Sequence, residues 1–290
     1  MSLKYKKFYV DTKYKTPDSV SNSNFSIELP EVMVCPSNCV MYLDDISIPY
    51  SWRTIEPGLN SRFYMFLVDD EVVPSRVWSF LLFLSDGNYI GSDLAVEIQN
   101  KINSATNNVG FTGPILQVSY SAKANTIKIE TSSQHLTFYI LTPSDLKDKL
   151  GGLFTTSYDV SNPRDCNEVL GNLDGYSPEY GVNKPFISGY INMAPIRNIY
   201  MHSSSLGTYQ TVALRPNGYD NTVIKHIPVN SNFNEMIYCD TVVVNDWLDC
   251  SGQTLKKIDI QLKTSRGDII PLHGVNMSFS LVFAKANSDY

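Results

Sequence analysis

Short stretches in which hydrophobic and polar residues alternate occur in both the first and the last part of the chain. Residues 25–29 place Phe, Ile and Leu at every second position before Pro30. A period of two predicts a strand with one face in a hydrophobic core. The run 40–48 continues this pattern, and the run 62–68 is hydrophobic on both faces. After residue 184 we expect six more strands, at 198–201, 209–214, 223–227, 235–244, 255–262 and 277–283.

The middle of the chain has a different pattern. After a hydrophobic run at 77–84 and a polar turn, Leu94, Ile98 and Ile102 recur at a spacing of four residues. This spacing places the three side chains on one face of a helix, for which Ser92 is the expected N-cap. A hairpin and a further strand are expected to follow, at 116–120 with 127–129 and at 136–141.

Two short segments share the signals of a brief helix. Each opens with a capping residue and a proline, Thr142-Pro143 in one and Asn162-Pro163 in the other, and each closes with leucine and glycine. Proline is favoured at the first helical position and glycine just beyond the last. We therefore expect short helices over 142–151 and 162–171, and a linker in the Gly-, Tyr- and Pro-rich run 171–185.

Together these elements predict a mainly β chain with an α+β unit between its early and late strands. Repeated short strands with long connections are typical of a sandwich or a jelly roll. An insertion is tolerated where the two ends of a loop already lie close together. We expect a discontinuous β domain at 1–73 and 184–290, interrupted by a compact inserted α+β domain at 74–183.

Composition agrees with short strands and polar turns. Charged residues make up only 18% of the 290 residues, against about 25% in an average soluble domain. The longest hydrophobic stretch, at 77–84, is far shorter than the ~20 residues of a membrane-spanning helix, so we expect no membrane span. The N-terminus lacks the hydrophobic segment of a secretory signal. A net charge of −6 argues against a general affinity for nucleic acid.

Lysine is nevertheless concentrated at the N-terminus, where Asp11 is the single acid among the first fifteen residues. One interpretation is a strand with a solvated face, and the other is a basic arm against a phosphate-rich partner such as packaged DNA. Phe8, Tyr9 and Val10 are typical strand residues and favour the first interpretation. The lysines are Lys4, Lys6, Lys7, Lys13 and Lys15.

The cysteines favour free structural thiols. Cys35 and Cys39 are three residues apart, but no second pair or nearby histidine completes a zinc site. A disulfide between Cys239 and Cys250 requires that they flank a hairpin. An odd total also leaves at least one thiol unpaired. The remaining cysteine is Cys166, and the four histidines, His135, His202, His226 and His273, are scattered singly.

No catalytic constellation is present in the sequence. It contains no G-x-S-x-G, H-E-x-x-H, P-loop or G-x-G-x-x-G motif. The acid pairs Asp44-Asp45 and Asp69-Asp70 lie at strand ends, and a metal or acid–base site would need further converging groups. We therefore expect no enzyme activity, no cofactor and no metal, and we nominate no catalytic, cofactor-binding or metal-binding residue.

Two other features have a structural and a functional interpretation. Arg266-Gly267-Asp268 is the tripeptide that binds integrins when it lies on an exposed loop of an extracellular protein. It falls between two expected strands, where glycine and aspartate suit a tight turn, and we favour the turn. Tyr42, Tyr50 and Trp52 are suited to stacking on a sugar, but core or interface packing is the more ordinary use of such residues.

The order of several segments resembles the penton (vertex minor capsid) proteins of virophages and of related polinton-like, or Maverick, viruses. The residues that carry the resemblance are the opening 8–11, the Ser/Asp/Asn-rich 16–24 with 25–30, the segment Tyr42-Leu-Asp-Asp-Ile-Ser-Ile-Pro49-Tyr-Ser-Trp52, the segment 86–94 leading to Ile98 and Ile102, and the late segments 199–206, 224–229, 272–274 and 278–283. Their order, which spans nearly the whole chain, is more specific than any one of them.

The resemblance implies a single jelly-roll sandwich, interrupted by an inserted α+β domain that projects outward. It implies a homopentamer at the icosahedral vertices of a small double-stranded DNA virus, in contact with the major capsid protein and made and assembled inside the host cell. The inserted domain is then expected to meet a host receptor. Two alternatives remain: a jelly-roll receptor- or glycan-binding head of a fibre, and an enzyme on a β-sandwich, which lacks any site in this sequence.

Overall fold

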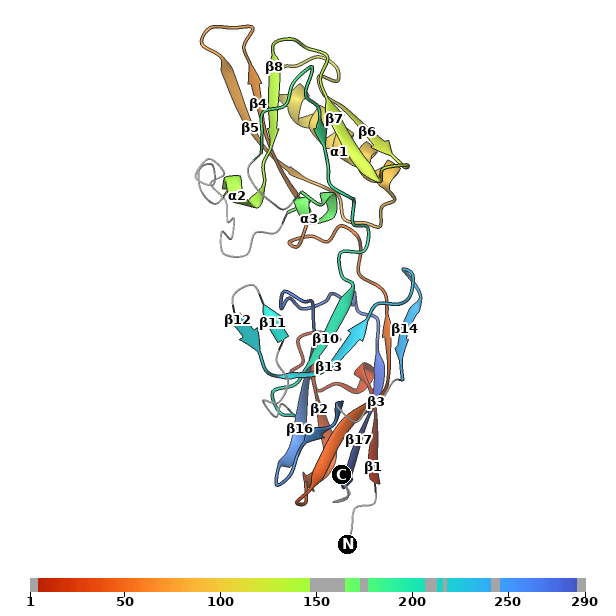
Figure 1. Ribbon diagram of the computed structural model, residues 1–290. Helices are drawn as coiled ribbons and strands as arrows, with labels where there is room; N and C mark the ends of the chain where they lie inside the picture. Colours follow the sequence, from red (N-terminus) through yellow and green to blue (C-terminus); the bar gives the residue numbers. More distant parts are fainter. Residues whose placement is uncertain are drawn as a thin grey trace. The chain divides into compact units, whose positions relative to one another are not determined.

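The structure is a computed structural model that describes residues 5–146, 165–172, 177–206, 213–215, 218–240 and 246–285 (Figure 1). Contacts within the chain divide it into two compact units. Unit 1 consists of residues 1–52 together with 196–290, and unit 2 consists of residues 53–195. Each unit has a hydrophobic core of its own. No helix among the described residues is long and apolar enough to cross a membrane.

The main strands of unit 1 pair in nested order, the first with the last. All four pairs are antiparallel: β1 (Tyr5–Asp11) with β17 (Ser278–Lys285), β2 (Asn24–Val34) with β16 (Thr254–Lys263), β3 (Cys39–Pro49) with β14 (Met236–Cys239), and β10 (Asn198–His202) with β13 (Val223–Pro228). Each pair therefore encloses the next one along the chain.

Two further pairings gather these strands into two sheets. β17 also pairs with β3, which gives the order β1-β17-β3-β14, and β16 also pairs with β10, which gives the order β13-β10-β16-β2. β15 (Leu248–Asp249) adds to β3, whereas β11 (Ala213–Arg215) and β12 (Gly218–Asp220) form a separate hairpin. A short 3-10 helix, η1 (Thr12–Tyr14), follows β1.

The core of unit 1 lies between these two sheets, because alternate side chains of each strand face inward. The alternation predicted at 25–29 is confirmed, since Phe25, Ile27 and Leu29 of β2 are all buried. The rings of Phe25 in one sheet and Phe279 in the other have centroids 6.3 Å apart. Such contacts join the two sheets into a β-sandwich.

Unit 2 combines one long helix with two small sheets. The sheets have the orders β5-β4-β8 and β6-β7-β9. The predicted hydrophobic stripe of the helix is confirmed, because Leu94, Ile98 and Ile102 are fully buried. The elements are β4 (Arg62–Asp69), β5 (Arg76–Phe83), α1 (Gly91–Asn108), β6 (Gln117–Ser121), β7 (Thr126–Glu130), β8 (Leu136–Ile140), α2 (Pro143–Asp145), α3 (Asn167–Leu170) and β9 (Phe186–Ile187).

β4 is buried on both faces, as its sequence predicts. On one face Phe63, Met65 and Leu67 share a core with α1. On the other face Tyr64 and Phe66 pack with a second cluster of buried residues, which includes Leu141 and Leu146. A strand that is covered on both faces has hydrophobic residues at nearly every position, which explains why residues 62–68 do not alternate.

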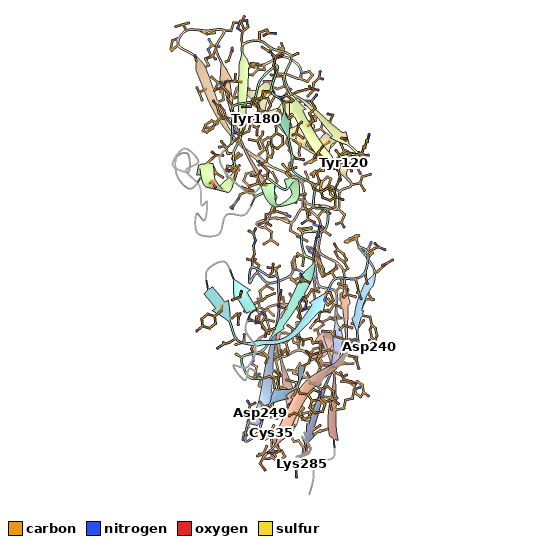
Figure 2. The ribbon with its side chains drawn as sticks, in the orientation of Figure 1. Cys35, Tyr120, Tyr180, Asp240, Asp249 and Lys285 are labelled. Atoms are coloured by element: carbon orange, nitrogen blue, oxygen red, sulfur yellow. The ribbon has the colours of Figure 1, made fainter. Side chains whose placement is uncertain are left out.

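The domain boundaries expected at 73/74 and 183/184 require correction. The contacts place them at 52/53 and 195/196. At the first boundary, β4 pairs with β5 and β8 and so belongs to unit 2. At the second, the described part of the expected linker 171–185 packs into unit 2, where Tyr180 and Phe138 exchange two backbone hydrogen bonds of 2.9 Å (Figure 2). The ring of Tyr180 also lies 5.4 Å from that of Phe186.

The start of α1 also differs from the prediction. The helix begins at Gly91, one residue before Ser92, and the residue at the N-cap position is Ile90, which has no side-chain capping bond. Gly91 also makes a tertiary contact in this first turn. A Cβ atom on Gly91 would lie 2.3 Å from the ring of Tyr120, so glycine lets the first turn pack against that ring.

The two short helices are confirmed where they are described. Thr142 caps α2, because the N–H of Asp145 donates to Thr142 Oγ1 at 3.3 Å. α3 ends at Gly171, which has the expected left-handed conformation with a φ of 62°. The predicted end of the first helix and the predicted start of the second, at 147–151 and 162–164, lie outside the described residues.

Candidate assembly surfaces

The outer face of the β1-β17-β3-β14 sheet carries a charged contact across its middle strand. Lys7 of β1 forms ion pairs with Asp44 and Asp45 of β3. The hydroxyl of Ser280, on β17 between them, donates to Asp45 Oδ2 at 2.5 Å. The hydrogen bond to Asp44 is the main reason that the pKa of Lys7 is raised above its usual range. This acid pair therefore ties β1 to the sheet.

The second acid pair has a local role. Asp69 ends β4, and its Oδ1 accepts a hydrogen bond of 3.0 Å from the N–H of Glu71. The N–H of Asp70 donates to His135 O at 2.9 Å. Within the ranges that the structure describes, no three His, Cys, Asp or Glu side chains are placed to hold a metal ion.

Aromatic and methionine side chains are exposed on the same outer face. Tyr9 is 79% exposed, and Lys7 Nζ lies 4.8 Å from the centre of its ring. Met236 and Tyr238 of β14 are 50% and 55% exposed. Tyr and Met are enriched in protein–protein interfaces, where they contribute large contact areas. This face is a candidate surface for contact with another protein.

The three aromatic residues considered for sugar stacking do not form one surface. Tyr50 and Trp52 are buried in the core of unit 1, with ring centroids 4.4 Å apart. Tyr42 stacks instead on Trp247, at 5.8 Å. The structural interpretation is confirmed for Tyr50 and Trp52.

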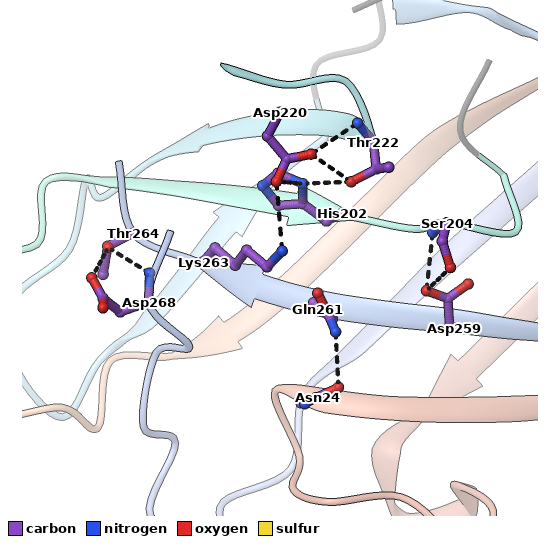
Figure 3. Close-up of polar contacts among 10 residues, drawn as sticks. All are labelled: Asn24, His202, Ser204, Asp220, Thr222, Asp259, Gln261, Lys263, Thr264 and Asp268. Atoms are coloured by element: carbon purple, nitrogen blue, oxygen red, sulfur yellow. Dashed lines mark hydrogen bonds and ion pairs between the residues drawn. The ribbon is translucent and has the colours of Figure 1, made fainter. Parts of the chain in front are cut away.

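The outer face of the β13-β10-β16-β2 sheet carries a polar cluster around a buried histidine (Figure 3). His202 of β10 is 1% exposed. Its Nδ1 lies 3.0 Å from Thr222 Oγ1 and 3.3 Å from Asp220 Oδ2. Lys263 Nζ of β16 lies 3.5 Å from the same carboxylate oxygen. The end of β12 is thus attached to the sheet through Asp220.

Opposing effects act on the pKa of Asp220. Burial raises the pKa, but hydrogen bonds from Thr222 and the charges of His202 and Lys263 lower it, and the net result lies well below the usual range. The hydrogen bonds from Thr222 are its N–H to Oδ1 at 3.1 Å and its hydroxyl to Oδ1 at 2.7 Å. Asp220 is therefore held as a carboxylate at neutral pH.

Asp259 anchors the loop that follows β10 in a similar way (Figure 3). It accepts hydrogen bonds from the N–H groups of Ser204 and Ser205, at 2.9 and 2.8 Å. Burial raises the pKa of Asp259, and these bonds outweigh that effect and lower it. The carboxylates of Asp220 and Asp259 are consequently held by contacts within the chain.

Arg266-Gly267-Asp268 forms the predicted turn. Thr264 Oγ1 accepts hydrogen bonds from the N–H of Arg266, at 3.2 Å, and from the N–H of Asp268, at 3.3 Å. The same hydroxyl donates to Asp268 Oδ2 at 3.1 Å (Figure 3). Gly267 has a φ of 101°, a conformation that glycine adopts without strain. The carboxylate of Asp268 is therefore turned back onto its own loop.

All five cysteines are free, as predicted. Cys35 lies at one end of the sandwich (Figure 2). Cys39 and Cys250 are its neighbours there, and Cys250 N donates to Cys39 O at 2.8 Å. Burial raises the pKa of Cys35 and of Cys250 to about 12. Thiols in this state are protonated at neutral pH and react slowly. Cys239 and Cys250 are not joined.

The described part of the N-terminal segment is a strand. Residues 5–11 form β1, and within it Lys6 pairs with Glu31 while Lys7 pairs with the acids of β3. These two charges are satisfied inside unit 1. The strand interpretation of the N-terminus is confirmed for these residues, and Lys4 lies outside the described part.

The cluster around His202 is not evident in the sequence. Its members His202, Asp220 and Lys263 are far apart in the chain, and the histidines are scattered singly. The available signal is weak: a histidine at the end of a hydrophobic strand and an Asp-x-Thr turn just before the next one. Only the pairing of β10 with both β13 and β16 brings these residues together.

No family model matches the sequence, and no curated protein does. Among solved structures the chain is similar to the selenomethionine-labelled mavirus penton protein, with a TM-score of 0.50 and 10% sequence identity. The match covers 98% of this chain and 100% of the mavirus chain. At this identity the likeness is one of fold alone, and it identifies a penton-like, mainly β fold.

Proposed function

We propose that the protein is a structural capsid protein that forms the pentameric penton at the icosahedral vertices of a small double-stranded DNA virus. The observation that carries this proposal is the likeness to the mavirus penton protein along nearly the whole of both chains. A match of this extent includes residues of both units. It therefore supports a shared arrangement of domains in the chain. Because fold does not by itself specify function, the proposal needs a direct test.

The strand pairing supports the assignment of unit 1 as a single jelly roll. A jelly roll consists of eight strands in two sheets, built from two Greek keys. Four nested antiparallel pairs, distributed over two packed sheets, have the connectivity that this fold requires. In this proposal unit 1 is the capsid domain, and unit 2 is an α+β domain inserted between β3 and β10.

Assembly of the pentamer would depend on complementary surfaces of neighbouring subunits. A ring of five repeats one head-to-tail contact, so every subunit needs two different surfaces that fit each other. In unit 1 the outer faces of the two sheets are two such different surfaces. One exposes Tyr9, Met236 and Tyr238, and the other carries the satisfied polar cluster around His202 and Asp259. We propose that unit 1 provides the ring contacts and the contacts to major capsid protein capsomers.

The remaining partners follow from this arrangement. Unit 2 would project from the vertex and meet a host receptor, and particles that lack it but attach normally to host cells would contradict this role. A contact between the N-terminus and packaged DNA receives no support from Lys6 and Lys7, whose charges are paired with Glu31, Asp44 and Asp45. The protein would be located in the virion, after synthesis and assembly inside the host cell.

The decisive experiment is the mass and symmetry of the purified full chain. Light scattering on a sizing column gives the mass, and averaged electron micrographs give the symmetry, with and without the major capsid protein. We expect five-fold rings with five times the chain mass of 32.6 kDa. A trimer that binds glycans would support the alternative, a receptor-binding head. A chain that stays monomeric even with the major capsid protein would contradict the proposal.

A further inference from the structure

β5 is an edge strand of unit 2 that lacks the usual protection against pairing with another chain. It is eight residues long, and it pairs with β4 through all of them without a bulge. Natural edge strands are commonly short, charged, bulged or interrupted by proline, because an open edge is a template for a further strand. The sequence Arg76-Val-Trp-Ser-Phe-Leu-Leu-Phe83 contains no proline, and its single charge is at one end.

The hydrogen-bond pattern shows which backbone groups face the open edge. Leu84 N donates to Ser61 O at 2.8 Å, so this pair is hydrogen-bonded. Bonded and non-bonded pairs alternate along an antiparallel ladder. Val77, Ser79, Leu81 and Phe83 therefore point their N–H and C=O groups away from β4. Within the part of the chain that the structure describes, these groups have no hydrogen-bond partner.

The side chains of the same four residues share one face of the strand, and that face is incompletely covered. Val77 and Phe83 are 61% and 56% exposed. Between them Leu81 packs against the buried cluster of Tyr64 and Phe66. The open edge is thus bordered by exposed hydrophobic side chains, which a further strand would cover.

We propose that β5 pairs antiparallel with β5 of a second copy of this chain, and so joins two three-stranded sheets into one. The register centred on Phe80 is the one that uses all four open residues. It places Val77 opposite Phe83 of the second copy, and Ser79 opposite its Leu81. Each such pair exchanges two backbone hydrogen bonds.

The side chains and the charges of β5 are both compatible with pairing to β5 of a second copy. An aromatic residue opposite a β-branched residue is a favourable cross-strand pair, and here it covers the two exposed hydrophobic side chains of the open face. In an antiparallel register the two Arg76 residues lie at opposite ends, so like charges do not meet.

The contact has two-fold symmetry and lies wholly in unit 2, so it is separate from the five-fold ring proposed above. It would join two free chains or chains that belong to two different rings. The two proposals can therefore fail independently, because one predicts five-fold symmetry and the other a doubling of mass.

The test compares the full chain with Ser79→Lys, which places a charge in the middle of the open edge. Ser119→Lys is the matched control, since Ser119 is also exposed in the middle of an edge strand, β6. Ser79→Pro removes one open N–H without adding charge, and proline is tolerated where that N–H faces solvent. Circular dichroism and thermal melting identify any variant that fails to fold.

Light scattering over a range of protein concentrations is the main measurement. We expect the mass of the wild-type chain and of Ser119→Lys to approach twice that of Ser79→Lys and Ser79→Pro. Amide exchange at 77–83 should also slow as the wild-type concentration rises. Equal masses for all four folded proteins, with fast exchange at every concentration, would overturn the proposal and leave the edge to a foreign strand.

Discussion

The two units differ in how their edge strands β2 and β5 are protected from pairing with another chain. At Ser26 the outer edge of β2 in unit 1 is covered by its own preceding loop, in which Thr16 N donates to Ser26 O at 2.8 Å and Ser19 Oγ accepts from Ser26 N at 3.0 Å. Pro30 lies further along the same strand, and β1 carries paired lysines. β5 of unit 2 has none of these features. Unit 1 is therefore suited to contacts through its faces, and unit 2 to contact through an edge.

The largest expected effect comes from removing the protection of unit 1. Deleting residues 1–11 removes β1 and exposes the edge of β17, whose inward side chains Phe279, Leu281 and Phe283 belong to the core. We expect unit 1 to unfold or aggregate, because an uncovered hydrophobic strand pairs with other chains. Light scattering measures the aggregation, and amide spectra of α1 report whether unit 2 stays folded. A soluble, fully folded deletion variant would contradict this view of β1.

Truncation of a core aromatic residue tests whether the units differ only at their edges. Phe279 in unit 1 and Phe138 in unit 2 are both buried, at 1% and 0% exposed. We expect Phe279→Ala and Phe138→Ala to lower the free energy of unfolding of their own unit by about 3–5 kcal/mol each. Urea unfolding followed by amide spectra of β17 for unit 1 and of α1 for unit 2 separates the two. A loss in only one unit would show that the cores differ as well.

Acid should weaken the polar outer face of unit 1. The pKa of Asp220 is lower in the folded chain than the ordinary value near 3.9, so its contribution is present above about pH 4 and is lost as the pH falls further. We expect Asp220→Asn to lower the free energy of unfolding by about 1–3 kcal/mol at pH 7. The difference from wild type should shrink toward low pH. Urea midpoints between pH 3 and 7 measure it, and a difference that does not change with pH would contradict the ionic role.

The smallest effect concerns single hydroxyl groups at the two edges. Ser19→Ala removes the acceptor of Ser26 N and should cost about 0.5–1.5 kcal/mol in the free energy of unfolding. Ser79→Ala in β5 removes no hydrogen bond of the described chain and should change stability little. Equal losses for the two variants would mean that the loop over β2 does not stabilise that edge.

Local pattern predicted most elements of the fold. The strands at 25–29, 77–84 and 255–262, the helical stripe of α1 and the turn at Gly267 were all evident, because each depends on the spacing of neighbouring residues. The free state of the cysteines also followed from their number and spacing. Each of these features can be predicted from residues that lie within one helix, strand or turn.

The domain boundary and the polar cluster were not predictable in this way. The run 62–68 predicts a strand, but nothing in its spacing states that it pairs with β5 and β8 in unit 2. The cluster of His202, Asp220 and Lys263 requires that the β11-β12 hairpin pack against the sheet in which β10 and β16 are neighbours. Likewise, Ser92 is the better capping residue by type, but the helix begins one residue earlier, at Gly91, which packs against Tyr120.

The amino-acid sequence alone therefore determined that the chain is mainly β, that an α+β segment interrupts it, and which side chains face a core. The tertiary structure decided which strand pairs with which, where one unit ends, and which edge stays open. The physical reason is that periodicity reports which side chains of a strand are buried, whereas the hydrogen bonds of strand pairing are made by backbone groups that every residue except proline carries. Only the folded chain shows that a loop covers the edge of β2 at Ser26 and that the described residues leave the edge of β5 open.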